Sequence, residues 1–360
     1  MTKRQSVNMN IYDFRDDPNA TEWTLPAWGY PLAVGVNPLF IELDDRIWPI
    51  GTAFNLGGGI GITVSAFHCI EEALKRQPTR NNQRLFNREI KDGTLERCNF
   101  FILRSYRTGK TQIQFHFLPL EKISAGPPAD IAFCSAKFVE GNLSLDSEIS
   151  FALPALDQPI HSIGYCDFKF PAGGVALSDI NDFDWENEYD HKFKVVEGYV
   201  ENVFTHNYAQ GYVRGPCFTF TESISSGMSG GPIYDLSRGV IFGMNSATAF
   251  EKGFSIGSLF FPYVLNTITF GADIFGDPRF RINSTQNIIQ MLEFGSIRSD
   301  GTHSELAYHE VPEGVAVSMR IPPEYRGRVF NDLNAKQSGT PPSTYDGPIY
   351  RRVKKAAENG

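Results

Sequence analysis

Apolar residues in the middle of the chain come in short runs that turn residues separate. From about Pro38 to Phe261 these runs are rich in β-branched and aromatic residues, and few helical periods interrupt them. Such spacing predicts antiparallel strands that form barrels or a sandwich. The clearest runs are 39–43, 60–66, 99–105, 111–117, 130–136, 160–166, 192–204, 217–220 and 239–245.

Other segments depart from this strand pattern. Residues 68–76 and 255–268 have helical patterns, and 177–192 gathers acids between two strands. For 177–192 we expect a solvated hairpin rather than an EF-hand calcium loop, because its spacing lacks the glycine and terminal glutamate of that loop. Beyond residue 270 we expect a helix at 285–294 capped by Ser284, linker-like sequence at 337–348 and a mobile basic tail.

Composition is that of a globular chain without a membrane span. The 360 residues are 41% hydrophobic and 21% charged with a net charge of −8, and no basic stripe indicates a nucleic-acid surface. No stretch is apolar enough to span a membrane, and no apolar run follows the first basic residues. Five cysteines without a CxxC pair argue against zinc and a disulfide framework, so we expect a cytoplasmic protein without metal or organic cofactor.

Three separate stretches carry candidate chemistry. Glycines surround Ser229 in SSGMSGGPIY (225–234), His68 follows an apolar strand in ITVSAFHC, and Asp130 heads the strand DIAFCSA. Any one motif is weak evidence, because a glycine-flanked serine is usually a turn and a strand-start aspartate is often a cap. Asp92 competes with Asp130, although KDG indicates a turn.

Together the three motifs resemble the chymotrypsin-like (trypsin-fold) serine peptidases. SAFHC is similar to the family's T-A-A-H-C, DIAF to its D-I-A-L strand and GMSGGP to its G-x-S-G-G-P, in the family's order of His, Asp and Ser. The resemblance covers roughly residues 35–268. It implies two six-stranded antiparallel β-barrels that divide near 140–155, with extensions at 1–34 and 269–360.

The resemblance also implies a role for each residue. His68 would be the general base, Asp130 would orient it and Ser229 would be the nucleophile. The backbone N–H groups of Gly227 and Ser229 would form the oxyanion hole. Cys69 takes a position that the family often uses for a disulfide, but the partner strand GTAFN has no cysteine, so we expect a buried thiol rather than a nucleophile.

Two departures bear on activation and specificity. Met228 stands where animal digestive members carry the aspartate that receives a freed N-terminus, so that salt bridge cannot form. The family's substrate pocket corresponds to Ser223, Asn245, Ser246 and Ala247, none of which is a carboxylate, although Glu222 is adjacent. We therefore expect cleavage after uncharged residues.

The sequence thus predicts a serine endopeptidase that acts on polypeptides. A peptidase-fold binding module and an esterase-like acyl hydrolase are the alternatives. A regulatory protein could bind through the terminal extensions, and neither nucleic acid nor membrane is an expected partner.

Overall fold

The fold is taken from a computed structural model. It describes residues 11–26, 35–56, 62–76, 94–96, 100–108, 112–125, 130–136, 147–204, 215–249, 253–273, 281–311, 314–319 and 350–351. Asp92, Cys98 and most of the predicted linker and tail lie outside these residues.

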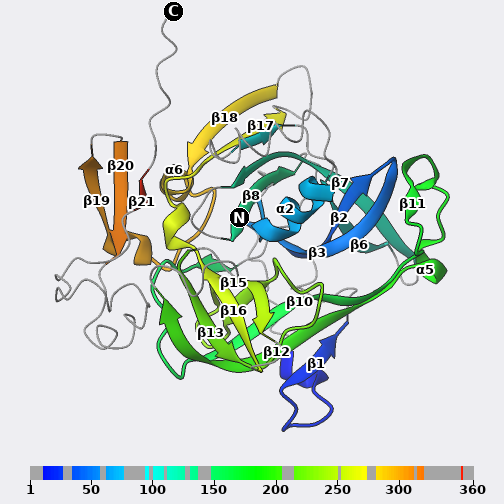
Figure 1. Ribbon diagram of the computed structural model, residues 1–360, viewed down its shortest axis with the longest axis horizontal. Helices are drawn as coiled ribbons and strands as arrows, with labels where there is room; N and C mark the ends of the chain where they lie inside the picture. The colour runs from blue at the N-terminus through cyan, green and yellow to red at the C-terminus, as the bar shows by residue number, and fades with distance from the viewer. Residues whose placement is uncertain are drawn as a thin grey trace, which may run out of the picture.

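The first half of the chain closes into a barrel (Figure 1). The ring runs β3-β2-β6-β7-β8-β4, and pairing of β4 with β3 closes it. Closure leaves no open sheet edge, and the short strands β5 (Thr94–Glu96) and β11 (Val175–Ala176) pair outside the ring. Its strands are β2 (Val36–Leu43), β3 (Arg46–Leu56), β4 (Ile62–Ala66), β6 (Phe100–Thr108), β7 (Gln112–Ala125) and β8 (Ile131–Ala136).

A second barrel follows below it in the same view. The ring runs β12-β10-β14-β15-β16-β13, and β13 pairs with β12 to close it. β1 (Glu22–Leu25) adds to β12, and β9 (Glu148–Ile149) adds in parallel to β15. The strands of this ring are β10 (Pro159–Lys169), β12 (Asp190–Phe204), β13 (Cys217–Thr221), β14 (Pro232–Asp235), β15 (Val240–Ala249) and β16 (Phe254–Leu259).

These two closed rings confirm the predicted double six-stranded antiparallel barrel. One buried apolar cluster runs through both barrels, and the rings of Phe54 and Phe260 meet across them at 6.4 Å. Helices are short: α2 (Phe67–Arg76), α5 (Trp185–Glu188) and α6 (Ile288–Glu293). The predicted helix at 68–76 is confirmed as α2, and the one predicted at 285–294 is present as the shorter α6.

The helix predicted at 255–268 is wrong. Residues 254–259 form β16, and only Phe261–Tyr263 makes a turn of 3₁₀ helix (η5) before β17 (Thr267–Asp273). β16 lies between β13 and β15 and is buried on both sides, and its buried residues include Ser255 and Ser258 as well as Ile256 and Leu259. Periodicity alone cannot separate such a short buried segment from a helix.

The predicted cap of the helix near 285 is also wrong. Ser284 lies within β18 (Arg281–Asn287), opposite Phe270 of β17. Asn287 caps α6 instead, because its side chain accepts a hydrogen bond from Gln290 N while the Gln290 side chain accepts one from Asn287 N. This reciprocal capping box satisfies two backbone donors and fixes where the helix begins.

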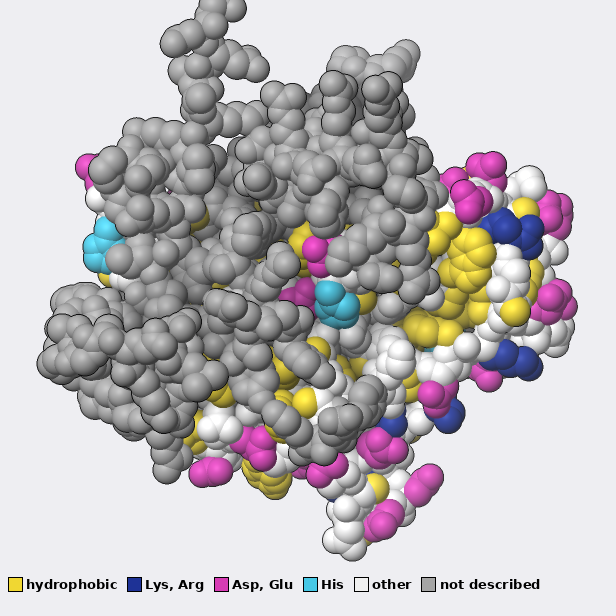
Figure 2. Space-filling model, viewed as in Figure 1, with side chains coloured by type: hydrophobic (Ala, Val, Ile, Leu, Met, Phe, Trp, Pro, Cys, Tyr) yellow, Lys and Arg dark blue, Asp and Glu magenta, His cyan; other side chains and the backbone are white. Residues whose placement is uncertain are grey.

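The acidic segment 177–192 is folded against the first barrel rather than being a solvated hairpin. It contains η3 (Leu177–Asp179) and α5, and Phe183, Trp185 and Tyr189 pack in an aromatic cluster with Phe40 and neighbouring rings. Figure 2 shows apolar side chains on this end of the molecule, with acids around them. The aromatic residues thus attach the segment to the barrel, while Asp184 caps α5 by accepting a hydrogen bond from Asn187 N.

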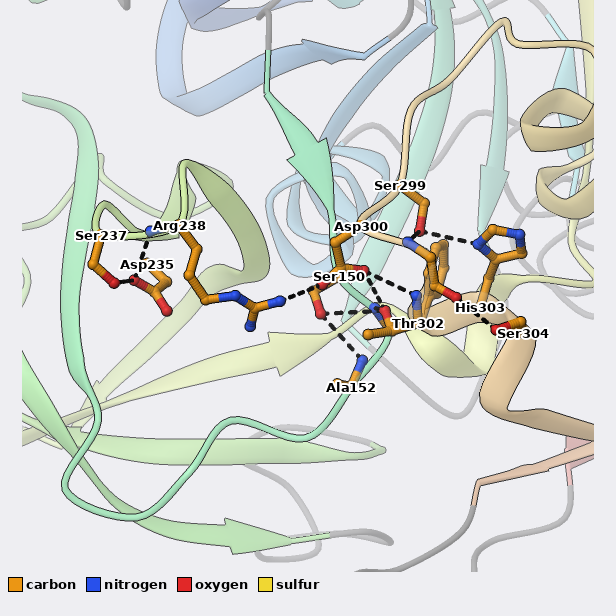
Figure 3. A network of polar contacts seen from close by, with 12 residues as sticks. Ser150, Ala152, Asp235, Ser237, Arg238, Ser299, Asp300, Thr302, His303 and Ser304 are labelled. Carbon is orange, nitrogen blue, oxygen red and sulfur yellow. Dashed lines mark hydrogen bonds and ion pairs between the residues drawn. The ribbon is translucent and has the colours of Figure 1, made fainter.

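Segments before and after the barrels pack against them: β17, paired with β18, lies against β7 and β8 of the first barrel, and the other segments attach to the second. On the N-terminal side, η1 (Ile11–Phe14) precedes β1. On the C-terminal side, Asp300 pairs with Arg238 at 2.8 Å and Thr302 binds Phe151 N, as Figure 3 shows for the surrounding network. The remaining elements are η8 (Thr302–Glu305), β19 (Leu306–Val311), β20 (Gly314–Met319) and β21 (Tyr350–Arg351), the strands forming a small sheet of their own.

Candidate active site

Strand register brings His68 and Asp130 together. β4 pairs with β8 so that Ala66 lies opposite Ile131, and the residues that follow β4 therefore lie beside those that precede β8. His68 N donates to Asp130 Oδ1 at 2.7 Å, and His68 Nδ1 lies 2.7 Å from Asp130 Oδ2. Two bonds to one carboxylate fix both the backbone and the ring of the histidine.

Asp130 is buried and has a third partner. It is 8% exposed, and the Ser246 hydroxyl donates to its Oδ2 at 2.7 Å. Ser246 Oγ also lies 2.7 Å from Ser258 Oγ, so the hydroxyl is itself held in place. A buried carboxylate needs such partners, because burying it without them is costly. The carboxylate is therefore held in one orientation.

The surroundings of His68 change its pKa. Burial alone would lower the pKa, but the Cys69 thiol and the Asp130 carboxylate raise it well above the usual range of histidine. Cys69 Sγ lies 3.5 Å from His68 Nε2, and Asp130 holds the other ring nitrogen. The ring thus has a carboxylate at Nδ1 and a thiol beside Nε2.

The glycines of the serine turn allow close packing against strands of both barrels. Gly230 has φ +89°, and a Cβ there would lie 2.0 Å from Thr52 O. Gly227 has φ +96°, and a Cβ there would lie 2.8 Å from a Phe168 ring carbon. Thr52 N donates to Ser229 O at 2.9 Å, and Thr52 Oγ1 donates to Gly227 O at 2.8 Å. A side chain at Gly230 would therefore hold the turn away from β3, and one at Gly227 would clash with β10 of the second barrel.

Some backbone N–H groups of this turn donate hydrogen bonds within the chain and others do not. Met228 N donates to Ser225 O, Gly230 N to Asn245 O and Gly231 N to Met228 O. Among the residues that the structure describes, the N–H groups of Gly227 and Ser229 donate to no acceptor. Backbone donors are rarely left unpaired in folded proteins, so these two are available to an external acceptor.

The Ser229 hydroxyl is not bonded to His68 in this structure. It donates to Ser246 O at 3.3 Å, and within the described part of the chain no hydrogen bond joins it to His68 Nε2. Catalytic hydrogen bonds are often long or misaligned without substrate. The structure thus brings His68 next to Asp130 and connects Ser229 to the same group through Ser246.

Comparison with known proteins yields distant structural likenesses. A scan of protein-family models and a search of curated proteins gave no match. The MamO protease domain from Magnetospirillum magneticum is similar over 64% of this chain and 93% of its own, at 13% identity and a TM-score of 0.37. The Rv3671c protease from M. tuberculosis, active form, covers 66% of this chain and 82% of its own, at 13% identity and a TM-score of 0.36. Deg5 covers 61% of this chain and 82% of its own, at 17% identity and a TM-score of 0.36.

The four predicted pocket residues lie in different environments. Asn245 is fully buried, and its amide donates to Ile163 O and Met228 O, so it braces the serine turn. Ser246 binds Asp130, whereas Ser223 and Ala247 are partly exposed. Sequence spacing placed Ser246 near the site, but nothing in the sequence indicated that its hydroxyl meets Asp130. The role of Thr52 has no sequence signal either.

The cysteines that the structure describes form no disulfide. They are the buried thiols Cys69, Cys134, Cys166 and Cys217. A Cβ at Gly51 would lie 3.2 Å from Cys69 Sγ, so glycine occupies the position from which a disulfide partner would reach it. Within the described ranges, no three His, Cys, Asp or Glu side chains gather in a group that could hold a metal ion. Nor is any described helix long and apolar enough to cross a membrane.

Proposed function

We propose that the chain is a serine endopeptidase with His68 as general base, Asp130 as its orienting carboxylate and Ser229 as nucleophile. The observation that carries the proposal is the pair of hydrogen bonds between Asp130 and His68. One joins the carboxylate to His68 N and the other to His68 Nδ1, each at 2.7 Å. A buried carboxylate in this position keeps the proton on Nδ1 and leaves Nε2 free to accept one.

Chemistry at Ser229 follows from this arrangement. The hydroxyl turns from Ser246 O toward His68 Nε2, gives up its proton as it attacks the substrate carbonyl, and forms a tetrahedral intermediate. His68 then passes that proton to the leaving amine, and water removes the acyl group from Ser229 by the same path. Charge on the intermediate oxygen would be met by the N–H groups of Gly227 and Ser229, which lack acceptors in the described chain.

We further propose that the substrate is a polypeptide cut after an uncharged residue. Glu222, the nearest carboxylate in the predicted pocket loop, accepts a hydrogen bond from Thr21 Oγ1 at 3.4 Å. That contact directs the carboxylate toward the N-terminal strand. A lysine or arginine side chain buried without a counter-charge is strongly disfavoured. A digest of a peptide library, analysed by mass spectrometry, would reveal the preference, and dominant cleavage after Lys or Arg would reject this part of the proposal.

A fluorophosphonate probe tests the nucleophile directly. Wild type should be labelled at Ser229, and Ser229→Ala should lose the label and lower peptide hydrolysis by about a millionfold, as in a comparable triad. Ser178→Ala is a matched control, because Ser178 is an exposed serine bonded to its neighbour Asp179. It should label and cleave like wild type.

The same experiment separates the alternative functions. A folded wild type that takes no label would indicate a binding module. A labelled chain that hydrolyses esters but no peptide would indicate an acyl hydrolase instead.

A further inference from the structure

The segment before the first barrel is firmly attached to the second one. β1 pairs with β12, placing Glu22 opposite Val196 and Thr24 opposite Lys194. Trp23 and Leu25 are 7% and 2% exposed, and Glu197 N donates to Thr21 O at 2.7 Å. β1 therefore behaves as an extra strand of the second barrel.

Polar contacts connect this strand and the residue before it with the loop before Ser229 by two routes. Glu22 Oε2 lies 2.6 Å from Lys194 Nζ, and the same ammonium donates to Ser225 Oγ at 3.0 Å. Thr21 Oγ1 donates to Glu222 Oε2 at 3.4 Å. Lys194 is only 15% exposed, so its ammonium requires polar partners such as these.

The loop that receives these contacts connects directly with the serine turn. Glu222 has φ +73°, an unfavourable conformation for a non-glycine residue that its surroundings must hold. Ile224 is fixed from the barrel side, because its N–H donates to Ser255 Oγ at 2.9 Å. Ser225 O accepts from Met228 N at 3.1 Å, one residue before Ser229. The contacts of Thr21, Glu22 and Lys194 thus help to hold the unfavourable backbone conformation of Glu222 and the turn at Ser225.

We propose that β1 is a positioning element for the nucleophile turn, acting through Glu22, Lys194 and Ser225. This inference rests on the proposed function. Lys194 and Glu22 are positioning residues: Lys194 holds Ser225 and hence the turn whose N–H groups face the substrate oxygen. An ammonium between a carboxylate and a hydroxyl forms charge-assisted bonds, which are stronger and more directional than neutral ones.

Labelling rates with the fluorophosphonate test this role. Lys194→Met should slow labelling of Ser229 about tenfold, since it removes a charge-assisted bond that is largely buried. Glu22→Gln should slow it about threefold, because this carboxylate is more exposed. The double variant should be no slower than Lys194→Met, since Glu22 acts through Lys194. Lys194→Arg should restore most of the rate.

The matched control is Lys192→Met on the same strand. Lys192 pairs with Asp167 at 2.8 Å on the exposed surface and should leave labelling unchanged. Hydrogen exchange of residues 222–231 should be faster in Lys194→Met and unchanged in Lys192→Met, with similar unfolding temperatures.

The outcomes distinguish this inference from the function on which it rests. A labelled wild type whose Lys194 and Glu22 variants react at the same rate would overturn the inference and leave the peptidase intact. Additive losses in the double variant would also overturn it. An unlabelled wild type would remove the proposed function and the inference together.

Discussion

Asp130 accepts three hydrogen bonds, two from His68 and one from Ser246. Asp130→Asn would place an amide where an acceptor is needed and would favour the wrong tautomer of His68. We expect peptide hydrolysis to fall about ten-thousandfold, as in an analogous triad, while the chain remains folded. Steady-state kinetics with circular dichroism would test this.

Asp92→Asn serves as the control, because Asp92 was the competing candidate in the sequence. It should retain full activity. Full activity in Asp130→Asn together with loss in Asp92→Asn would reverse the assignment.

The raised pKa of His68 predicts an alkaline activity profile. A general base must be neutral, so kcat/KM should rise with pH through the pKa of His68, which lies well above 6.5. Cys69 is one cause of the increase, and its Sγ contacts Nε2 at 3.5 Å. Cys69→Ala should therefore move the acid limb of the profile to lower pH without loss of the plateau. An acid limb that does not move would show that the thiol has no influence on the ring.

At the scale of elements, the serine turn depends on glycine for two separate reasons. Gly230 has φ +89° and also lies where a Cβ would be 2.0 Å from Thr52 O. Gly239, in the turn between β14 and β15, has φ +68° with nothing within 4 Å. Gly239→Ala should cost about 1 kcal/mol of unfolding free energy, the penalty for a left-handed backbone alone.

Gly230→Ala should cost several times that of Gly239→Ala and should abolish hydrolysis, because the turn must move away from β3. Urea unfolding of both variants provides the comparison. Equal losses of unfolding free energy in the two variants would mean that the close packing at Gly230 adds nothing to the cost of its left-handed backbone.

Sequence patterns predict the barrel strands well even where both faces are buried, as in β4 and β8, because β-branched runs end there at turn residues. The helix predicted over β16 is wrong because its short sequence, with Ser255, Gly257 and Ser258, runs directly into the apolar residues of η5, and periodicity does not mark the end of the strand. The cap predicted at Ser284 is wrong because Asn287, with Gln290 three residues later, completes a capping box.

At the scale of the whole molecule, contacts between distant segments were beyond sequence reasoning. The pairing of His68 with Asp130 could be predicted from motifs, but the contact of Ser246 with Asp130 joins positions 116 residues apart. The same holds for Thr21 and Glu222, which are 201 residues apart. Barrel closure brings such positions together, and no local pattern encodes it. The contacts of the segments outside the barrels are of this kind too, because β1 and Asp300 both attach to the second barrel.

Two buried histidines in the second barrel predict how the whole fold responds to acid. Burial lowers the pKa of His161 and of His191 to about 4. His161 lies against Tyr12, with Nε2 2.6 Å from the tyrosine hydroxyl and 3.8 Å from Glu197 Oε1, and His191 packs on the Tyr165 ring at 4.9 Å. In the unfolded chain both would titrate near 6.5.

Between these values the unfolded chain binds protons that the folded chain does not, so stability should fall as pH drops below 6.5 toward 4. Each histidine should account for about 2 kcal/mol of unfolding free energy between pH 6.5 and about pH 5. His191→Phe keeps an aromatic ring in the cluster and removes the titration. Urea unfolding at both pH values should therefore show a pH dependence smaller than that of wild type by about 2 kcal/mol. Carboxylates that titrate in the same range contribute equally to both proteins, so the difference isolates the histidine. An identical pH dependence in the two proteins would mean that His191 is protonated in the folded state, in conflict with its burial.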